Sequence, residues 1–152
     1  MMDIYVVSKG NAERALFSTY AGGPSLINWN SSGYWLTGYG ATVSSDPSAP
    51  IQDNHRYRVT AHDNGSGSFP SDKRPYMFSQ NESDGTGLYH SVNVRMYSFK
   101  LSYNGTLARD MYPCYRVSDN AAGLYDIVNN VFYPNESGGT DFTKGPEYVG
   151  VL

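Results

Sequence analysis

The segment from Val92 to Met111 constrains the fold of this chain more than any other stretch. From Val92 to Tyr103, apolar and aromatic residues recur at alternate positions, which is typical of a β-strand. Asn104-Gly105 follows, a pair that favours a two-residue hairpin turn because both positions accept a positive φ angle. Thr106 to Met111 then predicts the returning strand. The first strand should use both faces, with Val92, Val94 and Met96 on one and Tyr97, Phe99, Leu101 and Tyr103 on the other.

Short runs of strand-forming residues, separated by turn residues, make up the rest of the chain. Sixteen glycines and eight prolines supply turns, while aromatic residues, which favour strands, make up 14% of the sequence. No helical periodicity extends over a helix-length segment. A chain of 152 residues can be built around a single core, so residues 1–152 are expected to form one domain. The prediction is an all-β fold, a two-sheet antiparallel β-sandwich.

Charge and cysteine content exclude several classes of protein. The formal net charge is −3 and the lysines and arginines are scattered, so nucleic acid is not expected as a partner. Cys114 is the single cysteine, which rules out an internal disulfide and a cysteine cage for a metal; we predict a buried structural thiol. The N-terminal residues do not have the pattern of a signal peptide. No apolar run approaches the roughly 20 residues of a membrane span.

The acidic residues do not have the arrangement of a glycosidase. Such enzymes need two carboxyl groups on either side of the scissile bond. The four glutamates lie in turn or tail contexts, and none belongs to an alternating acidic strand. Asp110 and Asp126 lie on predicted strands, where each is interpreted as pairing with an arginine or capping a turn. The three histidines are not accompanied by a Gly-x-Ser-x-Gly nucleophile motif. We therefore predict no enzymatic activity and no catalytic residues.

Two polar loops contain the oxygen ligands that calcium prefers. They are Asn81-Glu82-Ser83-Asp84-Gly85 and Asp63-Asn64-Gly65. Neither has the Asp-x-Asp-x-Asp-Gly spacing of a calcium loop, and Asp-Gly and Asn-Gly are also common turn sequences. No metal ligand is therefore assigned and no cofactor is expected, with Ca²⁺ as the one ion that these loops could hold.

One short segment contains both tryptophans of the chain together with tyrosines and asparagines. Flat aromatic rings can stack on sugar rings or form contact surfaces for a protein, and amides can bond hydroxyl groups. The alternative is that the tryptophans flank a hairpin and point into the core, which we expect for at least one of them. The better candidates for exposure are Tyr34 and Tyr39. The candidate glycan or partner surface consists of Asn28, Trp29, Asn30, Tyr34, Trp35 and Tyr39.

The second half of the chain resembles a known family. The resemblance covers residues 92–146 and is strongest in Met96-Tyr97-Ser98-Phe99-Lys100-Leu101, in Asn104 to Cys114, in Gly123 to Tyr133 and in Gly138 to Pro146. These segments resemble the C-terminal half of LamG-like jelly-roll domains of the concanavalin A-like lectin/glucanase superfamily, of the kind found in gut bacterial surface proteins and in phage tail or virion proteins. The resemblance implies a jelly roll with a binding or structural role. It transfers no catalytic or calcium-binding motif.

The resemblance also suggests where such a module would act. The leading interpretation is a phage or prophage virion protein, tail-associated or head-decorating, that is assembled in the host cytoplasm and contacts host glycan, a receptor or other virion proteins. The alternative is a carbohydrate-binding or adhesin module of a longer bacterial surface protein. Family members usually begin with one more strand than this chain, which opens at Asp3-Ile4-Tyr5-Val6-Val7. We therefore expect an open sheet edge that Glu147 to Leu152 or a second copy of the chain could pair with.

Overall fold

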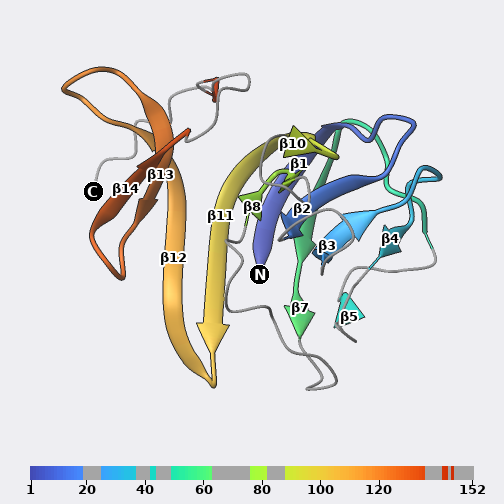
Figure 1. Cartoon of the computed structure of the whole chain (residues 1–152), viewed down its shortest axis with the longest axis horizontal. Helices are drawn as coiled ribbons and strands as arrows, with labels where there is room; N and C mark the ends of the chain where they lie inside the picture. Colours follow the sequence, from blue (N-terminus) through green and yellow to red (C-terminus); the bar gives the residue numbers. More distant parts are fainter. Residues whose placement is uncertain are drawn as a thin grey trace.

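The computed structural model of the chain is an all-β, two-sheet antiparallel β-sandwich, as predicted (Figure 1). It describes residues 1–18, 25–36, 42–43, 49–62, 76–81, 88–135, 142–143 and 145. None of these residues is helical. No helix that could cross a membrane is therefore found in this part of the chain.

The larger sheet has six antiparallel strands. Their order is β14 (Val131–Pro134), β13 (Ala122–Asp126), β12 (Thr106–Tyr115), β11 (Asn93–Tyr103), β1 (Met2–Ser8) and β6 (His55–Val59). The predicted hairpin connects β11 to β12: Tyr103 pairs with Thr106, and Asn104 and Gly105 have φ angles of 47° and 77°. Both signs match the turn expected for Asn-Gly.

The second sheet has four strands and covers one face of the larger sheet. Its order is β4 (Trp35–Leu36), β3 (Ser25–Trp29), β2 (Arg14–Ser18) and β8 (Tyr76–Met77). Two further strand pairs join β5 (Thr42–Val43) to β7 (Ala61–His62), and β9 (Gln80–Asn81) to β10 (Leu88–Tyr89). In Figure 1 β2, β3 and β4 lie on the side of β1, away from β12, β13 and β14.

The core lies between the two sheets. Alternate residues of β1 point into it, and Met2, Ile4 and Val6 are fully buried. Such alternation lets one face of a strand be apolar while the other carries polar groups. Side chains from both sheets, together with Ile51 before β6, complete the core: Leu16, Phe17, Ile27, Trp29, Trp35, Ile51, Val59, Phe99, Met111 and Leu124.

A β-bulge changes the predicted faces of β11. Ile4 pairs with Met96 and Met2 pairs with Phe99, so the register shifts by one residue between these pairs. Because Met2 and Ile4 both point into the core, Met96 and Phe99 also lie on the core face. The prediction that they face opposite ways is wrong, since simple alternation omits the extra residue of a bulge. Tyr97 is the extra residue of the bulge and lies on the outer face, opposite to Met96, where Arg56 stacks on its ring.

The N-terminal strand is not a sheet edge. β1 pairs with β11 on one side and with β6 on the other, so the expectation of an open edge at Ile4 to Val7 is wrong. Pairing with strands distant in the sequence, β6 and β11, covers both of its edges. Among the described strands of the larger sheet, β6 and β14 are the outermost. The segment from Glu147 to Leu152, expected as an alternative partner, lies outside the described residues.

Candidate ligand-binding face

Five of the six residues that the sequence suggests as a ligand surface are described by the structure, and they do not form one exposed surface. Trp29 is fully buried and Trp35 nearly so, and their rings meet edge to face with centroids 5.8 Å apart. The indole Nε1–H of Trp29 donates to the Lys9 carbonyl oxygen at 3.0 Å. Both tryptophans are therefore core residues whose rings a ligand cannot reach. We expected at least one tryptophan to point into the core, and the structure shows that both do.

The two asparagines of that segment have local structural partners. Asn28 is buried, and its amide Nδ2 donates to Glu13 Oε1 at 2.7 Å. Asn30 Oδ1 accepts hydrogen bonds from the backbone N–H groups of Ser32 and Tyr34, each at 3.0 Å, and so orders the turn between β3 and β4. The Tyr34 side chain is 39% exposed. Tyr39 lies outside the described residues.

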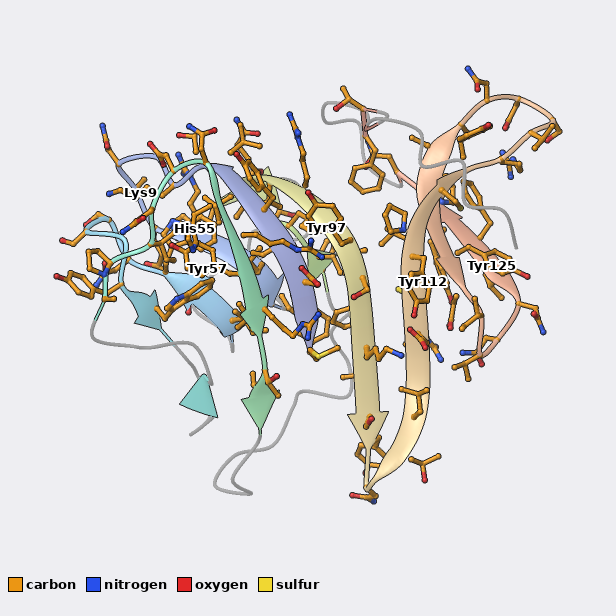
Figure 2. All side chains as sticks on the ribbon, turned by 180° about the vertical axis from the view of Figure 1, so that it is seen from behind. Lys9, His55, Tyr57, Tyr97, Tyr112 and Tyr125 are labelled. Carbon is orange, nitrogen blue, oxygen red and sulfur yellow. The ribbon has the colours of Figure 1, made fainter. Side chains whose placement is uncertain are left out.

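A different set of aromatic side chains lies together on the outer face of the six-stranded sheet, the face that points away from the core. Residues that pair across neighbouring strands share a face, and Tyr112 pairs with Tyr125, which pairs with Phe132. Lys100 pairs with Asp110, two residues before Tyr112, so the same face continues onto β11. Figure 2 shows Tyr97, Tyr112 and Tyr125 on three successive strands. We call this surface the tyrosine face: Asp3, Tyr5, Arg56, Arg58, Arg95, Tyr97, Lys100, Asp110, Tyr112, Tyr125 and Phe132.

Three of the four tyrosines of this face are exposed. Tyr97, Tyr112 and Tyr125 are 41%, 39% and 37% exposed. The Tyr125 hydroxyl lies 3.3 Å from Asn130 Oδ1 and donates to it. Tyrosine combines a flat apolar ring with a polar hydroxyl, so a row of exposed tyrosines can stack on a ligand and still hydrogen-bond to it.

Arg56 holds the β1 and β6 part of the tyrosine face in place. Its Nε and Nη2 donate to the two carboxylate oxygens of Asp3 at 2.8 and 2.9 Å, and its guanidinium carbon lies 4.2 Å from the centroid of the Tyr97 ring. Arg58 Nη2 approaches the same carboxylate at 3.4 Å. The hydrogen bond from Arg56 is the main reason that the pKa of Asp3 is lowered. The two-point contact fixes the guanidinium plane against Tyr97.

A second ion pair lies next to Tyr112. Lys100 Nζ donates to Asp110 Oδ2 at 2.7 Å across β11 and β12, and this bond raises the pKa of Lys100. The Tyr112 hydroxyl also interacts with Lys100 and raises the pKa further. Asp110 Oδ1 is buried and has no hydrogen-bond partner in the described part of the chain. The Lys100–Asp110 ion pair therefore holds the Lys100 ammonium group at the surface, beside the exposed ring of Tyr112.

Asp126 fixes the strands that carry Tyr112, Tyr125 and Phe132. Its side chain is fully buried, and Oδ1 accepts from the backbone N–H groups of Asp110 and Val128, each at 3.1 Å. Oδ2 accepts from Asn129 Nδ2 at 2.7 Å and lies 3.5 Å from Arg109 Nε. Burial alone would raise the pKa of Asp126, but the hydrogen bonds outweigh it and lower the pKa. Asp126 caps the turn and pairs with an arginine, the two roles expected from the sequence.

Gly123 allows the outermost aromatic ring of the face to pack. A Cβ atom at this position would lie 2.5 Å from the Phe132 ring and 2.4 Å from the Tyr133 carbonyl oxygen. The ring therefore occupies the space that a side chain at 123 would need, an arrangement that covers a strand glycine with an aromatic neighbour. On the Phe132 ring lies the guanidinium of Arg116, whose carbon is 5.1 Å from the centroid.

Cys114 is exposed, so the prediction of a buried thiol is wrong. It lies on β12 beyond Met111, which is the last β12 residue to contribute to the core. β12 from Tyr112 onward pairs with β13, and its residues from Tyr112 to Tyr115 are all exposed. Of the tyrosines nearby, Tyr112 belongs to the tyrosine face and Tyr115 lies on the opposite side of β12, and both are exposed.

The chemistry available on the tyrosine face is recognition by stacking, hydrogen bonding and charge. Its carboxylates, Asp3 and Asp110, are each engaged by a cation. In the described part of the chain no three His, Cys, Asp or Glu side chains gather as metal ligands would. Most of the two polar loops considered for calcium, residues 63–65 and 82–85, lies outside that part.

Sequence reasoning missed this face because its residues come from all six strands of the larger sheet, β1, β6, β11, β12, β13 and β14. The one local signal was alternation, which places Tyr112 opposite in direction to the core residue Met111. Comparison of the chain with protein-family models, curated proteins and solved structures gives no significant match. The resemblance to LamG-like domains therefore stays a prediction.

Proposed function

We propose that this protein is a non-catalytic binding module that recognises a glycan on its tyrosine face. The observation that carries the proposal is the set of Tyr97, Tyr112 and Tyr125 on the outer face of three successive strands, each more than one third exposed (Figure 2). Exposed aromatic residues that gather on one face mark interaction sites, whereas isolated ones do not. Planar rings suit the apolar faces of sugar rings, and the nearby hydroxyl and amide groups suit sugar hydroxyls.

A binding role agrees with the state of the carboxylates near these rings. A glycosidase needs one carboxylic acid with a raised pKa to protonate the leaving group. The carboxylate of Asp3 is instead held ionised by Arg56, with a lowered pKa, and Asp110 is bound by Lys100. These groups support the sheet and orient cations, and we assign them no catalytic step.

The setting of the module is proposed from the sequence resemblance. In LamG-like domains of phage virions and bacterial surface proteins, a binding face of this kind would contact host glycan or a receptor. A virion protein assembled in the host cytoplasm is the leading proposal, and an adhesin module of a longer bacterial surface protein is the alternative.

Glycan binding on the tyrosine face can be tested with matched tyrosine variants. A glycan array with the purified protein first identifies a ligand, whose affinity for Tyr97→Ala, Tyr112→Ala and Tyr34→Ala is then measured by calorimetry. Tyr34 has the same exposed fraction as Tyr112, 39%, but lies in the turn between β3 and β4, so its variant is the control. Loss of a central aromatic contact should weaken binding about tenfold, or roughly 1.4 kcal/mol.

These affinities distinguish binding on the tyrosine face from binding at the segment around Tyr34. Weaker binding by Tyr97→Ala and Tyr112→Ala, with Tyr34→Ala unchanged, supports the tyrosine face. If Tyr34→Ala alone weakens binding, the ligand lies instead at the segment suggested by the sequence. An array on which no glycan binds the folded protein refutes glycan recognition altogether. Far-ultraviolet circular dichroism of each variant checks that the sheets are intact.

A further inference from the structure

The cations of the tyrosine face are exposed, while its carboxylates are not. The side chains of Arg56, Arg58 and Lys100 are 57%, 70% and 38% exposed, and Arg95 is exposed as well. The side chains of Asp3 and Asp110, which bind three of these cations, are only 7% and 6% exposed. A molecule that approaches this face therefore meets guanidinium, ammonium and phenol groups before it meets a carboxylate.

From this arrangement we infer that the ligand of the tyrosine face is an acidic glycan, one that carries carboxylate or sulfate groups. The inference rests on the proposed function and specifies the chemical class of its ligand. An arginine beside an aromatic ring can bind the anionic substituent of a sugar while the ring stacks on the sugar itself. The tyrosine face has two such combinations, Arg56 on Tyr97 and Arg95 over Tyr5.

The charge of the molecule is distributed unevenly, and the tyrosine face is its positive part, as the binding of an acidic ligand requires. The tyrosine face has four cations and two carboxylates among the described residues, a formal charge of +2, whereas the whole chain has −3. The remainder of the chain therefore carries a formal charge of −5. Such segregation orients an anionic ligand toward the positive face and disfavours its binding elsewhere.

Arg95 is the cation best placed to bind a ligand anion. Its guanidinium carbon lies 5.6 Å from the centroid of the Tyr5 ring, across the β1–β11 pair. In the described part of the chain no carboxylate lies within ion-pair distance of it, in contrast to Arg56, Arg58 and Lys100. A free guanidinium can form two parallel hydrogen bonds with a carboxylate or sulfate group without breaking an existing ion pair.

A single-stranded nucleic acid is the other polyanion that binds aromatic and cationic sheet faces. Its affinity depends on many cations, because each neutralised phosphate contributes. Three of the four cations here already have a carboxylate partner, and the net charge of the face is small. A glycan with a few anionic groups among its stacked sugar rings therefore fits this surface better than a nucleic acid, which has one phosphate per nucleotide.

The test compares acidic glycans with neutral forms of the same backbone. Hyaluronan and polygalacturonate are each paired with their carboxyl-reduced forms, and dextran sulfate is paired with dextran, so that carboxylate and sulfate are tested separately. Affinities are measured by calorimetry at low and raised ionic strength for the wild type, for Arg95→Gln and for the control Lys9→Gln. Lys9 follows β1 in a loop, and Figure 2 places it apart from Tyr97 and Tyr112.

We expect at least one acidic glycan to bind about tenfold or more tightly than its neutral partner, with a preference that decreases as salt increases. Arg95→Gln should reduce this preference about tenfold, while Lys9→Gln should not change it. Equal affinities within all three pairs, a preference that Arg95→Gln leaves intact, or a thymidine oligonucleotide that binds more tightly than every glycan would overturn the inference. Neutral glycans that bind alone would overturn it and leave the proposed function standing; if no glycan of this panel or of the array binds, both fail.

Discussion

Replacing Asp126 by alanine should destabilise the protein through the strands that carry the tyrosine face. The fully buried carboxylate accepts three hydrogen bonds and pairs with Arg109. The variant leaves the buried N–H of Asp110 without its acceptor, at a cost of about 1–3 kcal/mol. Asn129 keeps its second bond, to the Ala108 carbonyl oxygen, and the half-exposed Arg109 can be hydrated again. Since losing one partner of a buried ion pair costs roughly 3–5 kcal/mol, we expect about 3 kcal/mol in total.

Urea unfolding measures this loss. For a slope near 2 kcal/mol per molar urea, a loss of about 3 kcal/mol lowers the midpoint by about 1.5 M. Fluorescence reports on the core through Trp29 and Trp35, which are both buried, while far-ultraviolet circular dichroism reports on all strands. Asp119→Ala is the control, because the ion pair of Asp119 with Arg116 and its hydrogen bond from the Ala121 N–H are both exposed, so its loss should shift the midpoint far less than that of Asp126. An Asp126→Ala midpoint equal to that of the wild type by both signals would refute the reasoning.

The pH dependence of the same difference tests the role of the charge. The folded pKa of Asp126 is lowered, so its carboxylate stabilises the fold fully above its unfolded pKa of about 3.9. This contribution is lost as the pH falls through the lower, folded pKa. The stability difference between the wild type and Asp126→Ala should therefore be constant near neutral pH and shrink below about pH 4. A difference that stays constant down to acid unfolding would show that the carboxylate charge contributes nothing.

Two further predictions concern β12 and β13. Gly123→Ala should lower stability by about 1–3 kcal/mol in urea unfolding, because its Cβ would meet the Tyr133 carbonyl oxygen at 2.4 Å and the Phe132 ring at 2.5 Å. Gly145→Ala should cause no loss, because Gly145 is exposed and no described atom lies within 4 Å of the added Cβ. A neutral Gly123→Ala would contradict the packing described for Phe132. Cys114 should react fully with a thiol reagent in the native protein, more slowly than a free thiol at neutral pH, because partial desolvation by its neighbours raises the pKa of this exposed thiol. Protection of Cys114 until the protein unfolds would show that the thiol is covered.

Local patterns in the sequence were sufficient for the strand content and several turns. Asn104-Gly105 specified its hairpin because few other residues adopt two successive positive φ angles, and the structure has that turn. The hairpin from Ser25 to Leu36 around Asn30 to Gly33 also follows from turn residues between strand-forming residues. The sandwich class followed from the number of such strands, since each one needs a second layer to cover its apolar face.

Which residues meet on a face was decided by the tertiary structure. The bulge between Met96 and Ser98 cannot be recognised from the sequence, because the extra residue is defined only by its pairing with β1. β1 itself reads as a first strand with an open edge, and only pairing with the distant strands β6 and β11 makes it central. The tertiary structure also decides which aromatic residues are exposed. Trp29 and Trp35 are buried because they lie where the second sheet covers the first. Tyr97, Tyr112 and Tyr125 are exposed because they lie on the face that points outward.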